Sequence, residues 1–163
     1  MNNNLIITIG RQYGTGGREI GQKLALRLGI PFYDRELITR AAKKTGFDEK
    51  LFEQLDKRAT NSFLYSLTMF GSVGLSGMSL TDQLYLAQSN IIREMAEDSS
   101  CVVVGRCADH VLRDFPNKFD FFIHGSIEDR VKRIQTCGDY EIEGKTPEAA
   151  LEKMDKQRST YYN

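Results

Sequence analysis

The sequence predicts an α/β fold in which a parallel sheet lies between two layers of helices. Three short runs rich in apolar residues have the length and composition of strands in a covered parallel sheet: Leu5–Ile9, Cys101–Val104 and Phe119–Ile123. Segments with helical spacing follow these runs. The first run is also joined to its helix by a glycine-rich turn, a connection typical of units that build parallel sheets.

Length, charge and cysteine content narrow the class of protein. The 163 residues predict a single domain over residues 1–163, and 22 basic side chains balance 22 acidic ones. A net charge of zero provides no general attraction to a polyanion, so nucleic acid is not an expected partner. The three cysteines are odd in number and lack metal-ligand spacing, and the N-terminus lacks the basic start of a secretory signal. We therefore expect a cytoplasmic protein, whose oligomeric state the sequence leaves open.

The first unit of the chain runs from strand to turn to helix to strand. After Leu5–Ile9, the turn Gly10–Arg18 leads into a helix that Gly29 is expected to end. The spacing of this helix is shown by three apolar residues, Ile20, Leu24 and Leu28. Pro31–Tyr33 predicts a brief second strand that ends at Asp34.

The middle of the chain combines helical patterns with an uncharged insert. Glu36–Lys44 and Asp48–Arg58 have helical patterning, and residues 59–81 carry no charged side chain. A membrane-spanning helix needs about 20 predominantly apolar residues, whereas serine and glycine interrupt this stretch. We therefore expect a flexible Ser/Gly-rich insert at 59–81 and no membrane partner.

A second half with the same alternation follows the insert. A long amphipathic helix is predicted from one apolar stripe: Leu84, Ala87, Ile91, Ile92 and Met95. Two further strands, Cys101–Val104 and Phe119–Ile123, are expected to be buried. Ser126 and Asp129 form a capping pattern, and Pro147 marks another helix start. A sheet of this class usually has a fifth strand and a covering helix beyond this point, so the chain either lacks the last strand and helix or closes differently.

The glycine turn has the composition of a phosphate-binding loop. Glycines let the main chain approach an anion, the helix N-terminus adds positive potential, and Arg11 and Arg18 bracket the turn. A turn that only connects strand to helix is the plainer alternative. The Walker pattern is out of register, because Gly16–Glu19 contains neither its lysine nor its hydroxyl residue and the spacing from Gly10 to Gly16 is one residue too long. A dinucleotide site, with Asp34 on a ribose, also remains open.

Ordered segments along most of the chain resemble the cytidylate kinase-like family. The segments are Ile7–Ile20, Gly29–Arg35, Val103–Arg106, Ser126–Arg133 and Met154–Arg158, the last followed by Tyr161 and Tyr162. The resemblance implies the fold of a P-loop nucleoside monophosphate kinase, with residues 126–160 as lid-like helices. It also implies transfer of the ATP γ-phosphoryl group to a nucleoside monophosphate such as CMP, with ATP and Mg²⁺ as cofactors.

The resemblance also implies roles for individual residues. The ATP phosphates would be bound by Gly10, Arg11, Gly14, Thr15, Gly16, Gly17, Arg18 and Glu19. The catalytic cations would be Arg18, Arg130, Arg133 and Arg158. The acceptor would be bound by Asp34, Arg35, Arg106, Asp109 and Asp155. The hydroxyl residue that would hold Mg²⁺ in such kinases is replaced here by Arg18 or Glu19, so the candidate Mg²⁺ ligands are our own hypotheses: Glu19 at the helix start and Thr15 within the loop.

The sequence departs from true nucleotide kinases at the metal and phosphate positions. The loop lysine is absent, and Val104 stands where such kinases carry an aspartate before Gly-Arg. Two alternatives therefore stay open beside the kinase. One is a nucleotide-binding regulatory module without turnover, and the other is a dinucleotide-dependent oxidoreductase.

Overall fold

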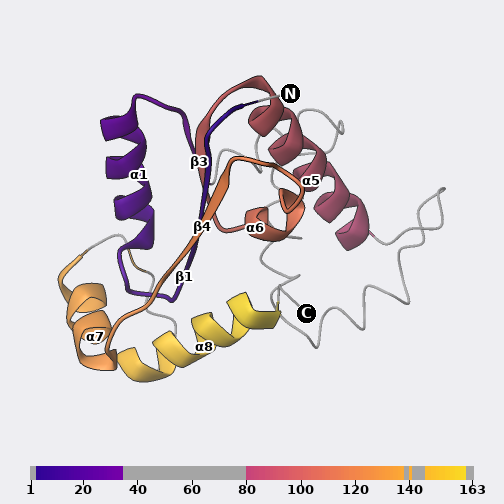
Figure 1. Ribbon diagram of the computed structural model, residues 1–163. Coiled ribbons are helices and arrows are strands. Elements are labelled where there is room, and N and C mark those ends of the chain that lie inside the picture. Colours follow the sequence, from indigo (N-terminus) through magenta and orange to yellow (C-terminus); the bar gives the residue numbers. More distant parts are fainter. Residues whose placement is uncertain (1–2, 35–79, 138–139, 141–145, 161–163) are drawn as a thin grey trace.

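The computed structural model describes residues 3–34, 80–137, 140 and 146–160. In this part of the chain four parallel strands form one sheet in the order β2-β3-β1-β4 (Figure 1). The strands are β1 (Ile6–Arg11), β2 (Phe32–Tyr33), β3 (Cys101–Val104) and β4 (Lys118–Ile123). Ile6 of β1 lies opposite Cys101 on one side and Lys118 on the other. The predicted parallel α/β sheet is confirmed.

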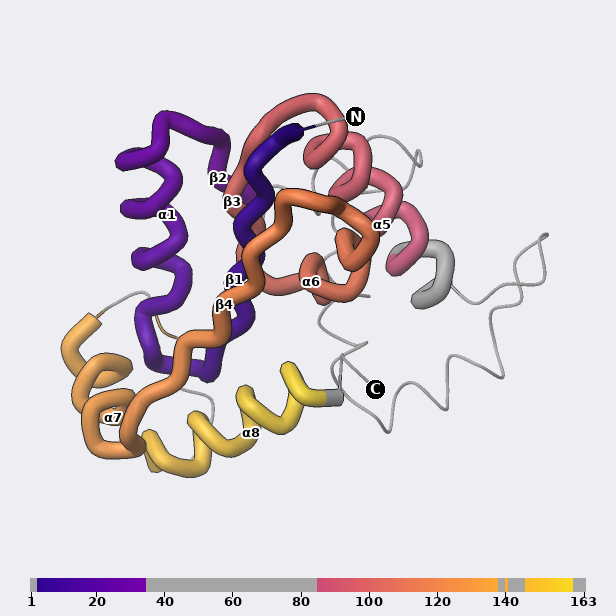
Figure 2. The backbone as a smooth tube through the Cα atoms, viewed as in Figure 1, coloured from indigo at the N-terminus to yellow at the C-terminus, as the bar shows by residue number. Residues whose placement is uncertain are grey.

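Helices cover the two faces of the sheet (Figure 2). The helix α1 (Gly17–Leu28) lies on one face, and α5 (Leu80–Asp98) with the short α6 (Ala108–Val111) lies on the other. Successive side chains of β1 point to opposite faces of the sheet and pack against different helices. Ile7 and Ile9 pack in one apolar cluster with Ala25 of α1, whereas Ile6 packs with Ile92 of α5 and Val111 of α6. The result is the predicted three-layer arrangement.

The helix α1 packs through its smallest residues. Gly21 and Ala25 are buried, while Ile20 and Leu28 of the predicted stripe are 43% and 45% exposed. A Cβ atom added to Gly21 would lie 2.8 Å from Cγ2 of Val104, so the helix approaches β3 to a distance that only glycine permits. The predicted end of the helix is confirmed, since Gly29 has φ 65° and donates its N–H to Leu26.

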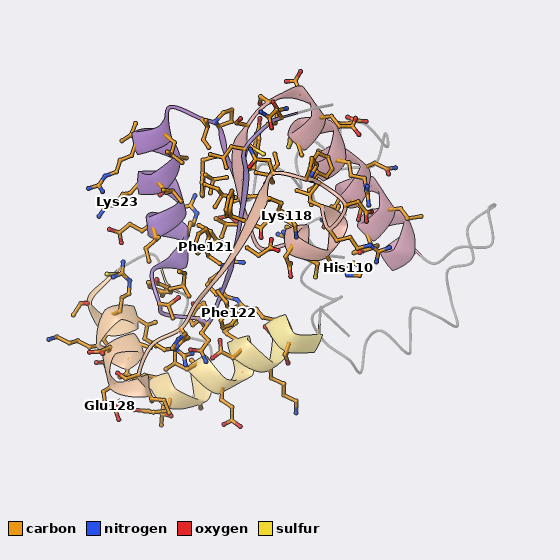
Figure 3. All side chains as sticks on the ribbon, viewed as in Figure 1. Lys23, His110, Lys118, Phe121, Phe122 and Glu128 are labelled. Carbon is orange, nitrogen blue, oxygen red and sulfur yellow. The ribbon has the colours of Figure 1, made fainter. Side chains whose placement is uncertain are left out.

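The prediction that the strand at Phe119–Ile123 is buried was wrong. Phe119, Phe121 and Phe122 are 52%, 50% and 62% exposed, because β4 lies at an edge of the described sheet and pairs with β1 alone. Figure 3 shows Phe121 and Phe122 along this strand. Lys118 ties β4 to its surroundings, since its Nζ donates to the Asp109 carbonyl at 2.8 Å and to Asp120 at 2.6 Å.

Two helices, α7 (Ile127–Thr136) and α8 (Pro147–Thr160), lie beyond the carboxyl ends of the strands (Figure 1). Both predicted starts are confirmed. The Ser126 hydroxyl accepts from the Asp129 N–H at 3.1 Å, and the Thr146 hydroxyl accepts from the Ala149 N–H at 3.2 Å. These helices meet the glycine turn in a small core of Tyr13, Ile134 and Leu151.

Several predicted features lie outside the described residues: the helices Glu36–Lys44 and Asp48–Arg58, and the insert as far as residue 79. The last two residues of the predicted insert, Leu80 and Thr81, belong to α5. Within the part that the structure describes, no helix is both long and apolar enough to cross a membrane.

Candidate functional site

The glycine turn leaves the start of α1 open. Gly14 and Gly16 have φ 79° and 74°, a left-handed conformation that favours glycine. Gly16 is the N-cap residue of α1, and the described part of the chain shows no side-chain capping hydrogen bond there. Main-chain N–H groups at an uncapped helix N-terminus form an anion-binding site. The local geometry is therefore that of a phosphate cradle.

An ion pair from α7 and α8 holds the middle of the turn at Tyr13. The Tyr13 N–H donates to Oδ1 of Asp155 at 2.7 Å, and Nε of Arg130 donates to the Tyr13 carbonyl at 2.7 Å. Arg130 and Asp155 are also paired with each other, and Arg130 is only 5% exposed. Both main-chain polar groups of Tyr13 are thus bound by one pair, the buried Arg130 and the partly buried Asp155, which fixes the shape of the turn.

Arg158 holds the same turn from α8. Its guanidinium lies 5.2 Å from the centre of the Tyr13 ring and donates to the Arg11 carbonyl at 3.1 Å. Burial, and after it the positive charge of Arg11, lowers the pKa of Arg158 to about 10. Two like charges therefore lie close together in a largely buried place, where a bound anion would stabilise both.

Asp34 gathers two arginines at the end of β2. This residue is 8% exposed and accepts from Nε of Arg18 at 2.7 Å. A guanidinium nitrogen of Arg11 lies 4.0 Å from its other oxygen. The residue predicted to bind the acceptor thus orients two cations beside the glycine turn.

Arg133 of α7 lies directly over the start of α1. A Cβ atom added to Gly16 would be 2.7 Å from Cζ of Arg133. The guanidinium pairs with Glu19, and its Nε donates to the Tyr140 hydroxyl at 3.3 Å. The hydrogen bond and charge of Lys23, followed by the charge of Arg133, lower the pKa of Glu19. The Arg133 guanidinium therefore covers the cradle while Glu19 holds it.

The charges around the turn are unequal in number. The five arginines described above, Arg11, Arg18, Arg130, Arg133 and Arg158, stand against the three carboxylates of Glu19, Asp34 and Asp155. Because positive charge predominates there, the arrangement favours a polyanionic ligand such as a phosphate chain.

The end of β3 is strained. Gly105, Arg106 and Cys107 have φ values of 77°, 60° and 50°, and two of these three residues are not glycine. Such backbone costs on the order of 1 kcal/mol per residue and is concentrated at functional sites. Asp109 in α6 lines a cavity of about 300 Å³ together with Gly10, the first residue of the turn, and with Thr8 and Asp120. The acceptor candidate Asp109 therefore faces a cavity that begins at the glycine turn.

The two predicted metal ligands do not form a Mg²⁺ site in this arrangement. The Thr15 hydroxyl donates to the Gln12 carbonyl at 2.9 Å, and Glu19 is held by Lys23 and Arg133. The described residues also contain no cluster of three acidic, His or Cys side chains suited to a metal. Arg35 lies outside the described residues.

Sequence reasoning allowed for Asp155 positioning Arg158, but it missed Tyr13 and the ion pairs of Asp155 with Arg130, Asp34 with Arg18 and Glu19 with Arg133. An aromatic residue inside a glycine turn was a usable signal, because it has no role in binding phosphate through the main chain. The spacing of Asp155 and Arg158 was another, since residues three apart lie on one face of a helix. Nothing local in the sequence pointed to Asp155 as an acceptor for a main-chain N–H.

The fold defines an α/β protein of the P-loop kinase type, and the glycine turn has the geometry of a phosphate-binding loop. The sequence matches the cytidylate kinase-like family over residues 6–163, and the chain belongs to that family. Membership supports phosphoryl transfer of the nucleotide-kinase type in general terms. A comparison with curated proteins finds no match.

Solved structures share this fold. An uncharacterized protein from Eubacterium ventriosum is 33% identical with a TM-score of 0.65, and the match covers 98% of this chain and 78% of that one. A shikimate kinase from Bacteroides thetaiotaomicron is 15% identical with a TM-score of 0.54, and the match covers 97% and 82% of the two chains. The second likeness concerns the fold alone.

Proposed function

We propose that this chain transfers the γ-phosphoryl group of ATP to a nucleoside monophosphate, CMP or a related small acceptor. One observation carries the proposal: an uncapped helix N-terminus behind a glycine turn, surrounded by arginines in excess over carboxylates. Family membership supports the reaction class. Phosphoryl transfer relies on positioning and on cationic stabilisation, which this arrangement supplies without a protein nucleophile.

In the proposed reaction, an oxygen of the acceptor attacks the γ-phosphorus and the bond to the β-phosphate oxygen breaks, so ADP leaves. The turn Gly10–Glu19 holds the donor phosphates. Arg18 and Arg133 neutralise the charge of the transferring group, since both lie beside the turn with part of their side chains exposed. Arg130 and Arg158 act through the turn that they hold.

The acceptor side of the proposal rests on Arg106, together with the family-derived candidates Asp34, Arg35, Asp109 and Asp155. Arg106 is favoured because it follows the buried strand β3 at its carboxyl end. Ligands of open α/β sheets bind outside the carboxyl ends of the strands. The helices at 126–160 are the proposed lid. Mg²⁺ is a family-based expectation, and no step is assigned to it because Thr15 and Glu19 do not fit it as placed.

The test is a transfer assay with radiolabelled [γ-³²P]ATP and each of CMP, UMP, AMP and GMP, with and without Mg²⁺. Labelled nucleoside diphosphate from CMP, absent without enzyme, is expected. ATP binding with no transfer to any acceptor would favour the regulatory module instead. Binding of NADP without binding of ATP would favour the oxidoreductase.

A further inference from the structure

The helix α1 begins with a glycine, whereas P-loop proteins carry a lysine at the start of this helix. In that pattern a lysine at the beginning of the helix reaches the β- and γ-phosphates. Here Gly17 stands at the first position of the helix, and the side chain of Arg11 fills the space beside it. A Cβ atom added to Gly17 would lie 2.7 Å from Cβ and 3.0 Å from Cγ of Arg11. The stem of Arg11 therefore passes over Gly17 in direct contact.

The other end of Arg11 lies against the end of β3. A Cβ atom added to Gly105 would be 2.0 Å from a terminal guanidinium nitrogen of Arg11 and 3.1 Å from Cζ. The side chain thus extends from the last residue of β1 to the first residue after β3, between two glycines. Its path requires that both positions lack a side chain.

This path follows the crevice in which open α/β sheets bind ligands. The strands β1 and β3 are neighbours. The chain leaves β1 toward α1 on one face and leaves β3 toward α6 on the other, as Figure 1 shows. Ligands bind where adjacent strands diverge in this way, outside their carboxyl ends. Arg11 places a guanidinium at that point.

The surroundings of Arg11 favour an anion. Its side chain is 21% exposed, and a guanidinium nitrogen lies 4.0 Å from Asp34, a carboxylate that also pairs with Arg18. Arg158 binds the Arg11 carbonyl, and its own pKa is lowered partly by the Arg11 charge. A phosphate chain in the crevice would separate these like charges and accept from both guanidinium groups.

We propose that Arg11 is the cation that binds the β- and γ-phosphates of the donor, and that Gly17 and Gly105 are glycines because the Arg11 side chain lies across them. The identity of the ligand as a nucleoside triphosphate rests on the proposed function. The binding of a phosphate chain by Arg11 does not rest on the proposed function, and a binding experiment tests it without turnover.

The experiment measures the affinity of the full chain for tripolyphosphate and for ATP by titration calorimetry, without metal. Arg11→Gln is expected to weaken both affinities by about 10- to 100-fold, as loss of a charge-assisted hydrogen bond implies. Arg11→Lys should lie between this variant and the parent. Gly17→Ala keeps Arg11 but displaces the stem of its side chain. This variant should weaken the affinity for each ligand at least about threefold. Arg27→Gln, at the exposed far end of α1, is the matched control and should leave both unchanged.

The outcomes separate this inference from the proposed function. Phosphoryl transfer with unchanged ATP affinity in Arg11→Gln would overturn the inference and leave the kinase intact. Weakened tripolyphosphate binding in a chain that transfers nothing would support the inference and refute the kinase. If Arg11→Gln fails to fold, the affinities of Arg11→Lys and Gly17→Ala test the inference instead. Affinities for tripolyphosphate and ATP equal to those of the parent in both variants overturn the inference. A parent chain that binds neither probe overturns both proposals.

Discussion

Arg130 and Asp155 form a clamp on the main chain of Tyr13 in the glycine turn. Removal of the Asp155 carboxylate tests this clamp most directly. Asp155→Ala deletes the acceptor of the Tyr13 N–H and the counter-ion of Arg130, which is only 5% exposed. Breaking a buried ion pair from one side costs about 3–5 kcal/mol. The Asp155 side chain is 26% exposed, so we expect the lower end of that range. At about 2–4 °C per kcal/mol for a domain of this size, about 3 kcal/mol lowers Tm by about 6–12 °C.

The assay is urea unfolding followed by circular dichroism, with Glu152→Ala on the exposed side of the same helix as the control. The control should change the free energy of unfolding by less than about 0.5 kcal/mol. Asp155→Asn keeps an acceptor for the Tyr13 N–H and should fall between the two. Hydrogen exchange at the Tyr13 amide should accelerate in Asp155→Ala and less in Asp155→Asn. An Asp155→Ala chain as stable as the control, with unchanged exchange at Tyr13, would refute the clamp.

Three further predictions follow from other contacts. Glu19→Gln should raise the affinity for tripolyphosphate about two- to threefold in calorimetry, because Arg133 loses a competing partner. Loss of Mg²⁺-dependent ATP binding in this variant would identify Glu19 as a metal ligand instead. Gly21→Ala should cost about 1–3 kcal/mol in urea unfolding, since its Cβ would lie 2.8 Å from Val104, and an unchanged midpoint would show that α1 can move away from β3. Burial raises the pKa of Cys101 to about 11 and that of Cys107 to about 12, so at pH 8 both thiols should react with a disulfide reagent far more slowly in the folded chain than in urea, and about tenfold faster for each pH unit gained. Equal rates for Cys107 in the folded and unfolded chain would contradict its burial.

Elements with a local signal were predictable from the sequence. Ser126 and Pro147 start helices because capping depends on a few adjacent residues, and the run Cys101–Val104 forms a strand buried on both sides. The burial of β4 was not predictable in this way. Its phenylalanines read as core, but its place at the edge follows from the order in which strands pair, and short runs of sequence do not encode that order.

The arginines of the site were predictable as positions but not as a network. Arg130 and Tyr13 are 117 residues apart in the chain, and Asp155 and Tyr13 are 142 apart. Charge spacing predicts contacts within one helix turn, and it says nothing about pairs that meet only when two helices dock on a turn. Sequence reasoning assigned Asp155 to the acceptor and Arg130 to the catalytic cations, and the structure adds that both contact the main chain of Tyr13.

This network bears on how the proposed lid moves. If residues 126–160 swung away as a rigid body, the contacts of Arg130 and Asp155 with Tyr13 would break and leave buried charged groups without partners. Such a motion would cost several kcal/mol, whereas the more exposed pair of Arg133 and Glu19 separates at small cost. We therefore expect the proposed lid to open at the Arg133 side chain, which an entering ligand displaces first, while α7 and α8 stay on the turn. Hydrogen exchange in the presence of tripolyphosphate should accordingly leave the Tyr13 amide protected, and loss of that protection on binding would show that the helices move as a unit.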